Sequence, residues 1–254
     1  MGMKIAVIQV DTAWADRDAN FAQLAPLIEA AASNGASLVL LTEMFSTGFV
    51  VDQGDIGEPE GGVSSRFLSR MATQHNIWIG GSCPEVKIDD PRPFNSFVLV
   101  SPHGEQHRYH KIHPFSFGGE DKHFRPGKDL VTVNVDGIRV TLFVCYDLRF
   151  ADEFWKTAAD TDVYLVPGNW PESRREHWIT LLRARAIENQ AFVVGCNRVG
   201  TGGGLTYAGD SRVINPLGEV IAEAQDQATS LYADISAQEV QSVRTAFPFM
   251  QDRR

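Results

Sequence analysis

The chain has 254 residues, of which 43% are hydrophobic and 22% charged, so it is long enough for one large α/β domain or two small ones. Its formal net charge of −9 argues against nucleic acid as the main partner, because phosphate binding needs a basic surface. No segment approaches the roughly 20 uninterrupted apolar residues that span a bilayer, so we expect no membrane association. The widely separated cysteines argue against a disulfide framework and for a reducing, cytoplasmic location.

The first half of the chain alternates between apolar strand patterns and amphipathic helix patterns. In chain order it predicts a strand at 4–11, a helix at 16–35, a strand at 36–45, a loop at 52–62, a helix near 64–75, and strands near 77–86 and 94–101. The 36–45 run is almost continuously apolar, which is typical of a central strand covered on both faces. Residues 103–129 predict one long irregular stretch, and such loops are usually functional.

The second half repeats this rhythm. It predicts a strand at 138–147, a helix near 150–159, a strand at 162–170, a helix at 173–190, a strand at 191–200, turn-rich strands over 206–235 and a short helix near 236–245. From about residue 246 we expect an extended C-terminal tail. Alternating strands and helices indicate an α/β layered fold, and no linker or change of composition divides it. We therefore expect a single domain over residues 1–254.

Three residues of catalytic type follow apolar runs or lie in the long loop, and the ends of strands are where α/β folds place their chemistry. Glu43 ends the run "LVLLTE", Lys111 lies in "RYHKIHPF", and Cys145 ends "LFVC". Each has an ordinary alternative: a capping glutamate, a solvated loop lysine, and a cysteine that packs as a small hydrophobe. Singly, none of the three decides between structure and catalysis.

Together, these segments resemble a known family. "LTEMFSTGF", "YHKIHPF" and "VCYDLRF" are similar to the three signature segments of the nitrilase superfamily, the carbon–nitrogen hydrolases, in that family's order. The "GGED" stretch places Glu120 where the family has a second glutamate. The likeness covers nearly the whole chain, and residues 169–200 resemble most closely the bacterial ω-amidases that act on 2-oxoglutaramate. The resemblance implies a four-layer αββα sandwich, a homodimer, and no metal or organic cofactor.

The resemblance also implies roles for these residues. Cys145 would be the nucleophile, and Lys111 would both favour its thiolate and donate to the oxyanion of the tetrahedral intermediate. The backbone N–H of Tyr146 would be the second oxyanion donor. Glu43 would protonate the leaving nitrogen and then activate water, and Glu120 would hold Lys111 or the substrate amide in place.

For two further residues, the sequence allows both a functional and a structural interpretation. Arg149 is a candidate for binding the substrate carboxylate, or it pairs with Asp147 or Asp152. Trp170 either walls a pocket or packs at the rim of the domain. The remaining candidates are expected to be structural or solvent-exposed: Cys83 and Cys196 as core residues, the charged residues of 172–176 as a solvated helix start, and His110 and His113 without partners at zinc-finger spacing.

The predicted function is hydrolysis of the terminal amide of 2-oxoglutaramate, and of similar ω-amidodicarboxylates, to 2-oxoglutarate and ammonia through a cysteine thioester. Such an enzyme would remove the keto product of glutamine transamination, as in methionine salvage. Within the same superfamily, an N-carbamoyl amide hydrolase and a nitrilase remain alternatives. Outside it, the alternatives are a non-catalytic metabolite-binding module and a thiol-redox protein, although no resolving cysteine lies nearby. The C-terminal tail is a candidate for the dimer interface.

Overall fold

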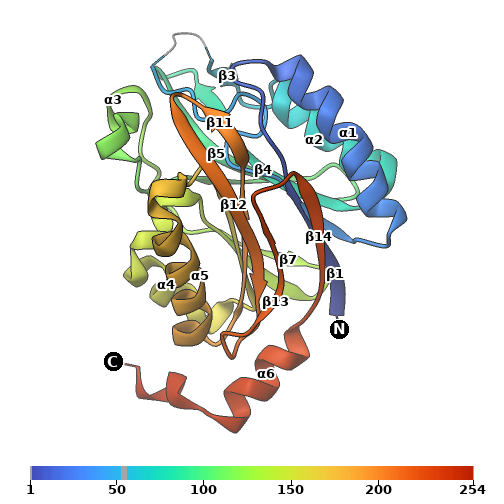
Figure 1. Cartoon of the computed structure of the whole chain (residues 1–254). Helices are drawn as coiled ribbons and strands as arrows, with labels where there is room; N and C mark the ends of the chain where they lie inside the picture. Colours follow the sequence, from blue (N-terminus) through green and yellow to red (C-terminus); the bar gives the residue numbers. More distant parts are fainter. Residues whose placement is uncertain (1, 53–55, 254) are drawn as a thin grey trace.

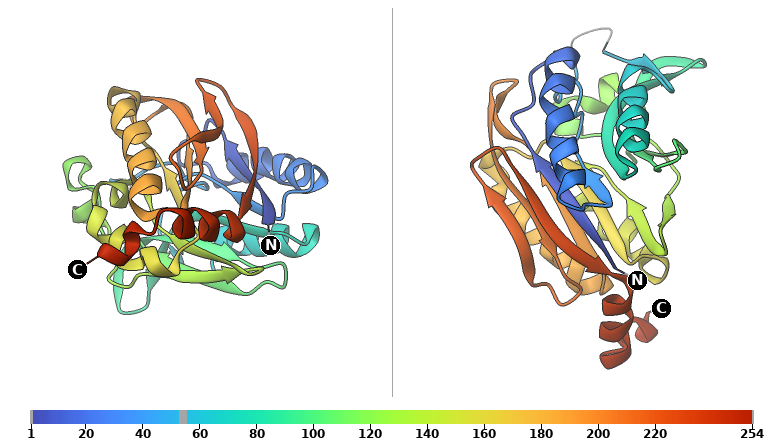
Figure 2. Two further views of the ribbon diagram at one scale, coloured as in Figure 1. Left: turned by 90° about the horizontal axis from the view of Figure 1, so that it is seen from below. Right: turned by 90° about the vertical axis from the view of Figure 1, so that its right-hand side faces the viewer.

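Two β-sheets pack face to face at the centre of the molecule, and helices cover their outer faces (Figure 1). The computed structural model describes residues 2–52 and 56–253. The outer layers are formed by α1 (Arg17–Ser33) and α2 (Val63–His75) on one sheet, and by α4 (Ala151–Thr157) and α5 (Arg175–Asn189) on the other. The layers separate clearly when the molecule is turned (Figure 2), which confirms the expected αββα arrangement.

The first sheet carries the N-terminal half of the chain. Its strand order is β14 (Thr229–Ser236), β1 (Gly2–Gln9), β2 (Leu38–Leu40), β4 (Trp78–Lys87), β5 (Asp90–Val100) and β6 (Gln106–His110), with β3 (Glu58–Pro59) paired to β4. Strands β1, β2 and β4 run parallel, as expected where helices connect successive strands. The C-terminal strand β14 returns antiparallel along the whole of β1 and closes this sheet.

The second sheet is built from the C-terminal half. Its order is β11 (Val199–Gly202), β12 (Leu205–Ile214), β10 (Phe192–Asn197), β9 (Val163–Gly168), β8 (Ile138–Leu142) and β7 (Thr132–Val135), with β13 (Val220–Gln225) paired to β12. Strands β8, β9 and β10 are parallel, so their carboxyl ends meet at one edge of the sheet. The chemistry-bearing segments after β8 and β9 therefore emerge side by side.

Strand β1 shows how the sequence produces these layers. Ile5 and Val7 point into the core between the two sheets, whereas Ala6 and Ile8 point into the core beneath α1 and α2. Side chains alternate across a strand, so a strand buried on both faces is apolar throughout. All four side chains are fully buried, which explains the unbroken apolar run at the start of the chain.

Several predicted boundaries are wrong. The 36–45 run forms a strand only over Leu38–Leu40, and the chain then leaves the sheet in irregular structure toward the site. Residues 103–129 are not one irregular stretch, because β6 and the short helix α3 (Glu120–His123) lie within them. Strand β7 was not expected at all. Burial on both sides makes a strand and a buried irregular segment look alike in sequence.

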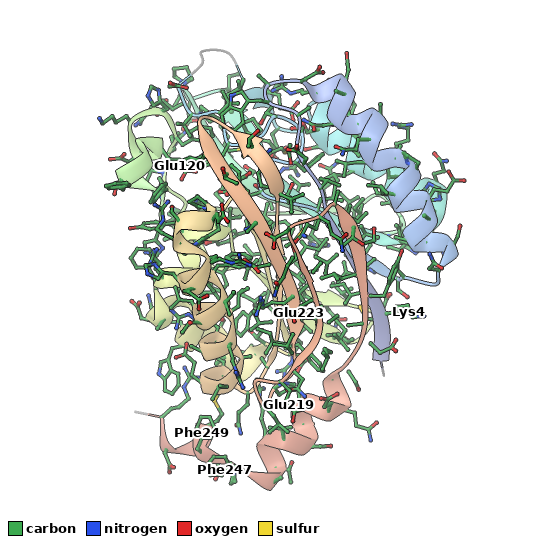
Figure 3. The ribbon with its side chains drawn as sticks, in the orientation of Figure 1. Lys4, Glu120, Glu219, Glu223, Phe247 and Phe249 are labelled. Atoms are coloured by element: carbon green, nitrogen blue, oxygen red, sulfur yellow. The ribbon has the colours of Figure 1, made fainter. Side chains whose placement is uncertain are left out.

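The C-terminal segment is not extended as expected. Helix α6 (Ala237–Ala246) is followed by a 3₁₀ turn over Phe249–Asp252. Phe247 and Phe249 lie at the opposite end of the molecule from Glu120 (Figure 3), so this segment does not reach the residues of the candidate site in its own chain. Among the described residues, no helix has the length and apolar character needed to cross a membrane.

Candidate active site

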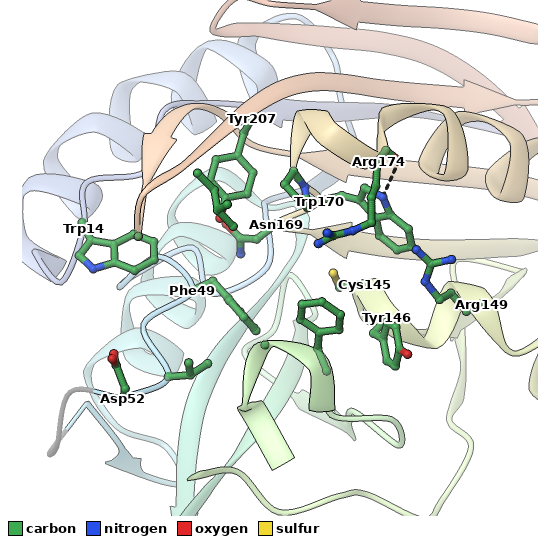
Figure 4. A pocket seen from close by; sticks show the side chains of 16 residues that line it. Trp14, Phe49, Asp52, Cys145, Tyr146, Arg149, Asn169, Trp170, Arg174 and Tyr207 are labelled. Carbon is green, nitrogen blue, oxygen red and sulfur yellow. Dashed lines mark hydrogen bonds between the residues drawn. The ribbon is translucent and has the colours of Figure 1, made fainter. Parts of the chain in front are cut away.

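Cys145 lies on a strained turn at the carboxyl end of β8. The strand ends at Leu142, earlier than expected, and Cys145 begins a 3₁₀ turn over Cys145–Arg149 with a φ of 47°. A positive φ is unusual for a residue with a side chain, and such strain persists where the surroundings impose it, often at functional sites. The turn presents the sulfur of Cys145 to the cavity described below (Figure 4).

Asp147 braces this turn. Its Oδ2 accepts hydrogen bonds from the Val144 N–H at 3.0 Å and the Tyr109 hydroxyl at 2.8 Å, and its Oδ1 accepts one from the His113 N–H at 2.9 Å. The carboxylate is fully buried, and these donors take up its lone pairs. Asp147 is thus a structural support of the nucleophile turn and is not paired with Arg149.

Glu43 lies beyond the end of β2 and is fully buried, and donors face both oxygens of its carboxylate. Its Oε1 accepts from Lys111 Nζ and from Asn95 Nδ2, both at 2.9 Å. Its Oε2 accepts from the backbone N–H of Asn169 at 2.8 Å, and the Asn169 amide also donates to the Glu43 carbonyl oxygen at 2.7 Å. Side chains from both sheets thus fix Glu43 between them.

Lys111 directly follows β6 and joins the two predicted glutamates. Its Nζ lies 2.9 Å from Glu43 Oε1 and 2.8 Å from Glu120 Oε2, with only 1% of the lysine exposed. Burial alone would lower the pKa of the Lys111 ammonium, but Glu120 and Glu43 outweigh burial and hold the pKa well above its ordinary value. Lys111 is therefore a fixed cation within the site.

Glu120 is the first residue of α3 and is fully buried. Besides Lys111, its Oε2 accepts the Phe115 N–H at 2.6 Å and its Oε1 accepts Asn95 Nδ2 at 3.0 Å. Burial raises the pKa of Glu120 above its ordinary value in spite of Lys111, and Glu43 adds to the rise. The structure thus brings together all four predicted catalytic residues, Glu43, Lys111, Glu120 and Cys145.

The expected thiolate is not supported. Burial raises the pKa of the Cys145 thiol well above its ordinary value, the Glu43 carboxylate raises it further, and Lys111 lowers it too little to compensate. Lys111 is already committed to two carboxylates, so its charge is largely neutralised as seen from the sulfur. The raised pKa favours the thiol form of Cys145, so a Cys145 that acts as a nucleophile would need a base to take its proton.

Cys145 opens into a cavity of about 340 Å³. In Figure 4, Arg149 and the Trp170 ring lie on one side of the cysteine, the charged end of Arg174 lies above it, and Trp14 and Asp52 lie on the other side. The cavity is lined by Trp14, Phe49, Val51, Asp52, Phe115, Gly118, Cys145, Tyr146, Arg149, Asn169, Trp170, Pro171, Arg174, Gly203, Leu205 and Tyr207. Its wall is mainly aromatic and aliphatic with a few charged groups, as is usual for small-molecule sites.

All three residues predicted to bind substrate lie at this cavity. The Arg149 guanidinium is 4.8 Å from the centre of the Trp170 ring and 3.1 Å from His177 Nδ1. Among the described residues it forms no ion pair with either predicted aspartate, so that alternative is wrong. Trp170 is both wall and packing residue, since it lines the cavity while its Nε1 donates to the Arg174 carbonyl at 2.8 Å. Tyr146 lies in the first turn after Cys145, where backbone N–H groups lack partners within the helix.

Three functional candidates were missed from the sequence. Asn95 and Asn169 contact the carboxylates directly, and Arg174 lines the cavity although residues 172–176 were expected to be solvated. Asn95 carried a usable signal, because together with Ser96 it interrupts the apolar residues of the second half of β5. Asn169 and Arg174 carried none, since a polar residue after a strand and an arginine at a helix start are both common.

The remaining candidates are held away from the cavity. Cys83 and Cys196 are fully buried and do not line it, and burial raises the pKa of both thiols. His110 Nδ1 lies 2.9 Å from Ser96 Oγ, and His113 stacks on a phenylalanine. Among the described residues, no group of three or more His, Cys, Asp or Glu side chains is arranged to hold a metal ion.

Comparison with known proteins agrees with this geometry. The family model for the carbon–nitrogen hydrolases matches residues 4–245. The chain is 40% identical to the ω-amidase YafV of Escherichia coli, over 99% of this chain and 96% of that protein, and 30% identical to the 2-oxoglutaramate amidase of Bacillus subtilis, over 100% and 98%. A carbon–nitrogen hydrolase superfamily protein from Xanthomonas campestris, solved with an arsenic adduct in its active site, superposes with a TM-score of 0.95 at 34% identity and covers 100% of this chain and 98% of its own.

Proposed function

The chain belongs to the carbon–nitrogen hydrolase family, and from that premise we propose that it is an ω-amidase that hydrolyses 2-oxoglutaramate to 2-oxoglutarate and ammonia. The observation that carries the proposal is a buried Cys145 beside Glu43, at the base of a cavity whose wall holds Arg149 and Arg174. Such a cavity offers a nucleophile and a base for the amide, and cations for the distal carboxylate.

In the first half of the reaction, Glu43 takes the proton of Cys145 while the sulfur attacks the carbonyl carbon of the amide. The negative charge that develops on the carbonyl oxygen is stabilised by Lys111 Nζ and the Tyr146 backbone N–H. Glu43 then returns the proton to the amide nitrogen, because ammonia leaves far more easily than an amide anion. The C–N bond breaks, and the acyl group remains on Cys145 as a thioester.

In the second half, Glu43, again a carboxylate, takes a proton from water as the water attacks the thioester. The same two donors stabilise the second oxyanion. The C–S bond breaks, and the proton held by Glu43 returns to the leaving sulfur of Cys145. The carboxylic acid product leaves, and the enzyme returns to its starting state. Glu120 keeps Lys111 in place through both halves, supported by the 2.8 Å contact between them.

The substrate carboxylate is assigned to the arginine side of the cavity. The Arg149 guanidinium lies 4.8 Å from the centre of the Trp170 ring, and a planar guanidinium can bind a carboxylate through two parallel N–H bonds. Arg174 lines the same cavity, with its charged end above Cys145 in Figure 4, and adds a second positive charge. The separation between these groups and Cys145 would then select the chain length of the substrate.

The test is ammonia release from a panel of 2-oxoglutaramate, 2-oxosuccinamate, glutamine, an N-carbamoyl amino acid and an aliphatic nitrile. We expect 2-oxoglutaramate to have the highest kcat/KM. Turnover of only the carbamoyl compound or only the nitrile would assign the chain to another branch of the family. Absence of turnover on every compound would favour a binding module on the same fold.

The cellular setting is part of the same proposal. The reaction that supplies the substrate is transamination of glutamine, as in methionine salvage, and the protein would act in the cytoplasm. We also propose one domain over residues 1–254 and a homodimer in which the segment from about residue 246 takes part. In support of the dimer, Phe247 is 66% exposed and Leu217 is 62% exposed. Light scattering on the purified chain, and on a chain truncated before residue 246, measures the oligomeric state.

A further inference from the structure

We propose that Asn95 is a positioning residue whose single amide nitrogen holds Glu43 and Glu120 together and keeps the proton off Glu43, so that Glu43 is ready to act as a base. The proposal deepens the proposed function and rests on Glu43 being that base. Both N–H groups of Asn95 Nδ2 are directed at the two carboxylates, so Asn95 acts through Glu43 and not on the substrate.

The geometry is specific to an amide. Asn95 Nδ2 carries two N–H groups and lies 2.9 Å from Glu43 Oε1 and 3.0 Å from Glu120 Oε1, so one group serves each carboxylate. The backbone carbonyl oxygen of Asn95 also accepts a hydrogen bond from the Lys111 backbone N–H at 2.9 Å. Asn95 therefore touches every charged residue of the cluster from the interior of β5, and it is only 1% exposed.

The charge balance of the cluster makes such a donor necessary. Glu43 and Glu120 share one ammonium, Lys111, and the three residues are at most 1% exposed. Burial, with Glu43 adding to it, raises the pKa of Glu120, so the cluster favours uptake of a proton, and a proton passed to Glu43 would disable it as a base. Among the described residues, the thiol of Cys145 and the phenol of Tyr207, whose pKa burial raises to about 12, also face this cluster, and neither adds positive charge.

The acceptor end of Asn95 supports the same conclusion. Its Oδ1 is buried and has no hydrogen-bond partner among the residues that the structure describes. An unpartnered buried oxygen destabilises the fold, whereas a leucine of similar shape would avoid that loss. The value of asparagine at this position therefore lies in its nitrogen, which contacts both carboxylates.

The experiment compares Asn95→Leu with the wild-type enzyme in the pH dependence of kcat/KM for 2-oxoglutaramate. Loss of a donor to an ionised carboxylate raises the pKa of that carboxylate, so the acid limb of the profile should move up by about one to two pH units. Activity should recover at pH values above the displaced limb. Asn95→Ser keeps one donor and should show a smaller displacement.

The matched control is Asn189→Leu, which removes an equally buried asparagine whose Nδ2 donates to the Arg185 carbonyl at 2.9 Å, on α5. It should lower thermal stability and leave the acid limb in place. A second readout is the pH dependence of Cys145 alkylation by iodoacetamide, which needs no substrate and should shift in the same direction.

An Asn95→Leu or Asn95→Ser profile that is lower at every pH, with an unmoved acid limb and an unchanged alkylation profile, would overturn the proposal and leave Asn95 as a packing residue. Failure of the wild type to release ammonia from 2-oxoglutaramate would instead contradict the proposed substrate. In that case the alkylation profiles of wild type and variants still decide the role of Asn95.

Discussion

Replacing Glu43 with glutamine tests the surroundings of the carboxylate more sharply than most conservative changes. Lys111 and Asn95 donate to Oε1, and the Asn169 N–H donates to Oε2. Glutamine has one acceptor oxygen and one NH₂ group, which cannot accept. In either orientation, one side of the Glu43→Gln amide therefore places a donor against a donor.

Two losses follow from Glu43→Gln, and their sizes differ. The amide cannot carry the catalytic proton, so kcat should fall by about 10²–10⁴. Breaking a buried ion pair costs about 3–5 kcal/mol when the partner is left alone. In the Glu43→Gln variant, Lys111 still has Glu120 as a partner at 2.8 Å. We therefore expect the free energy of unfolding to fall by about 1.5–3 kcal/mol, the contribution of one charged hydrogen bond.

The assay pairs ammonia release with denaturant unfolding, and Glu58→Gln is the control. Glu58 is also buried, at 6% exposure, and accepts the Ser64 N–H at 3.1 Å, but it pairs with neither Lys111 nor Cys145. The control should lose stability and keep kcat. A Glu43→Gln enzyme with near-normal kcat would refute the assignment of Glu43 as the base. If the kcat of Glu43→Gln fell only in proportion to the fraction of unfolded enzyme, the loss would come from instability and not from the missing catalytic proton transfer.

The remaining predictions concern the nucleophile, the carboxylate site and pH. Cys145→Ala should abolish turnover and leave the fold intact by circular dichroism, whereas Cys83→Ala and Cys196→Ala should keep most activity. An inactive Cys83→Ala or Cys196→Ala variant would contradict the assignment of Cys145 as the nucleophile. Arg149→Met should lower kcat/KM for 2-oxoglutaramate about 10- to 150-fold and leave butyramide hydrolysis nearly unchanged, and equal losses on both would make Arg149 a structural brace. Burial, with a smaller contribution from a nearby lysine, lowers the pKa of His110 from 6.5 to about 4. Between these pH values the unfolded chain binds more protons than the folded chain, so the melting temperature should fall as the pH drops from about 6.5 to 4. His110→Gln should reduce that dependence, and an unchanged slope would contradict it.

The sequence was informative where chemistry requires one residue type at one place. Glu43, Lys111 and Cys145 stood out as reactive side chains in an apolar setting, and the resemblance of their segments to the nitrilase superfamily then implied a catalytic role; the structure brings them to one buried cluster. Asn169 and Arg174 were not found, because nothing local distinguishes them from polar residues at ordinary strand and helix ends. They become functional only through the packing of β9 and α5 against segments far away in the chain.

The expected thiolate failed for a related reason. The proximity of Lys111 to Cys145 was correctly anticipated, but a pKa depends on all the charges and on burial at once. Two carboxylates already bind the lysine, and the sulfur is buried beside one of them. Sequence patterns indicate which groups meet but not how one cation is shared among three partners, and that sharing decides the protonation state of the nucleophile.

The same local reasoning explains how a chain of net charge −9 can select an anion. Salt screens the overall field within about 10 Å, so it hardly reaches into a cavity. Inside the cavity, Arg149 lies on one side of Cys145, the charged end of Arg174 lies above it, and the acidic Asp52 lies on the other side (Figure 4). A substrate with one carboxylate and one amide then has a single favourable direction, with its carboxylate toward the arginines. The reversed orientation would bring the carboxylate toward Asp52, and this difference in local charge, more than the net charge, orients the amide toward the sulfur.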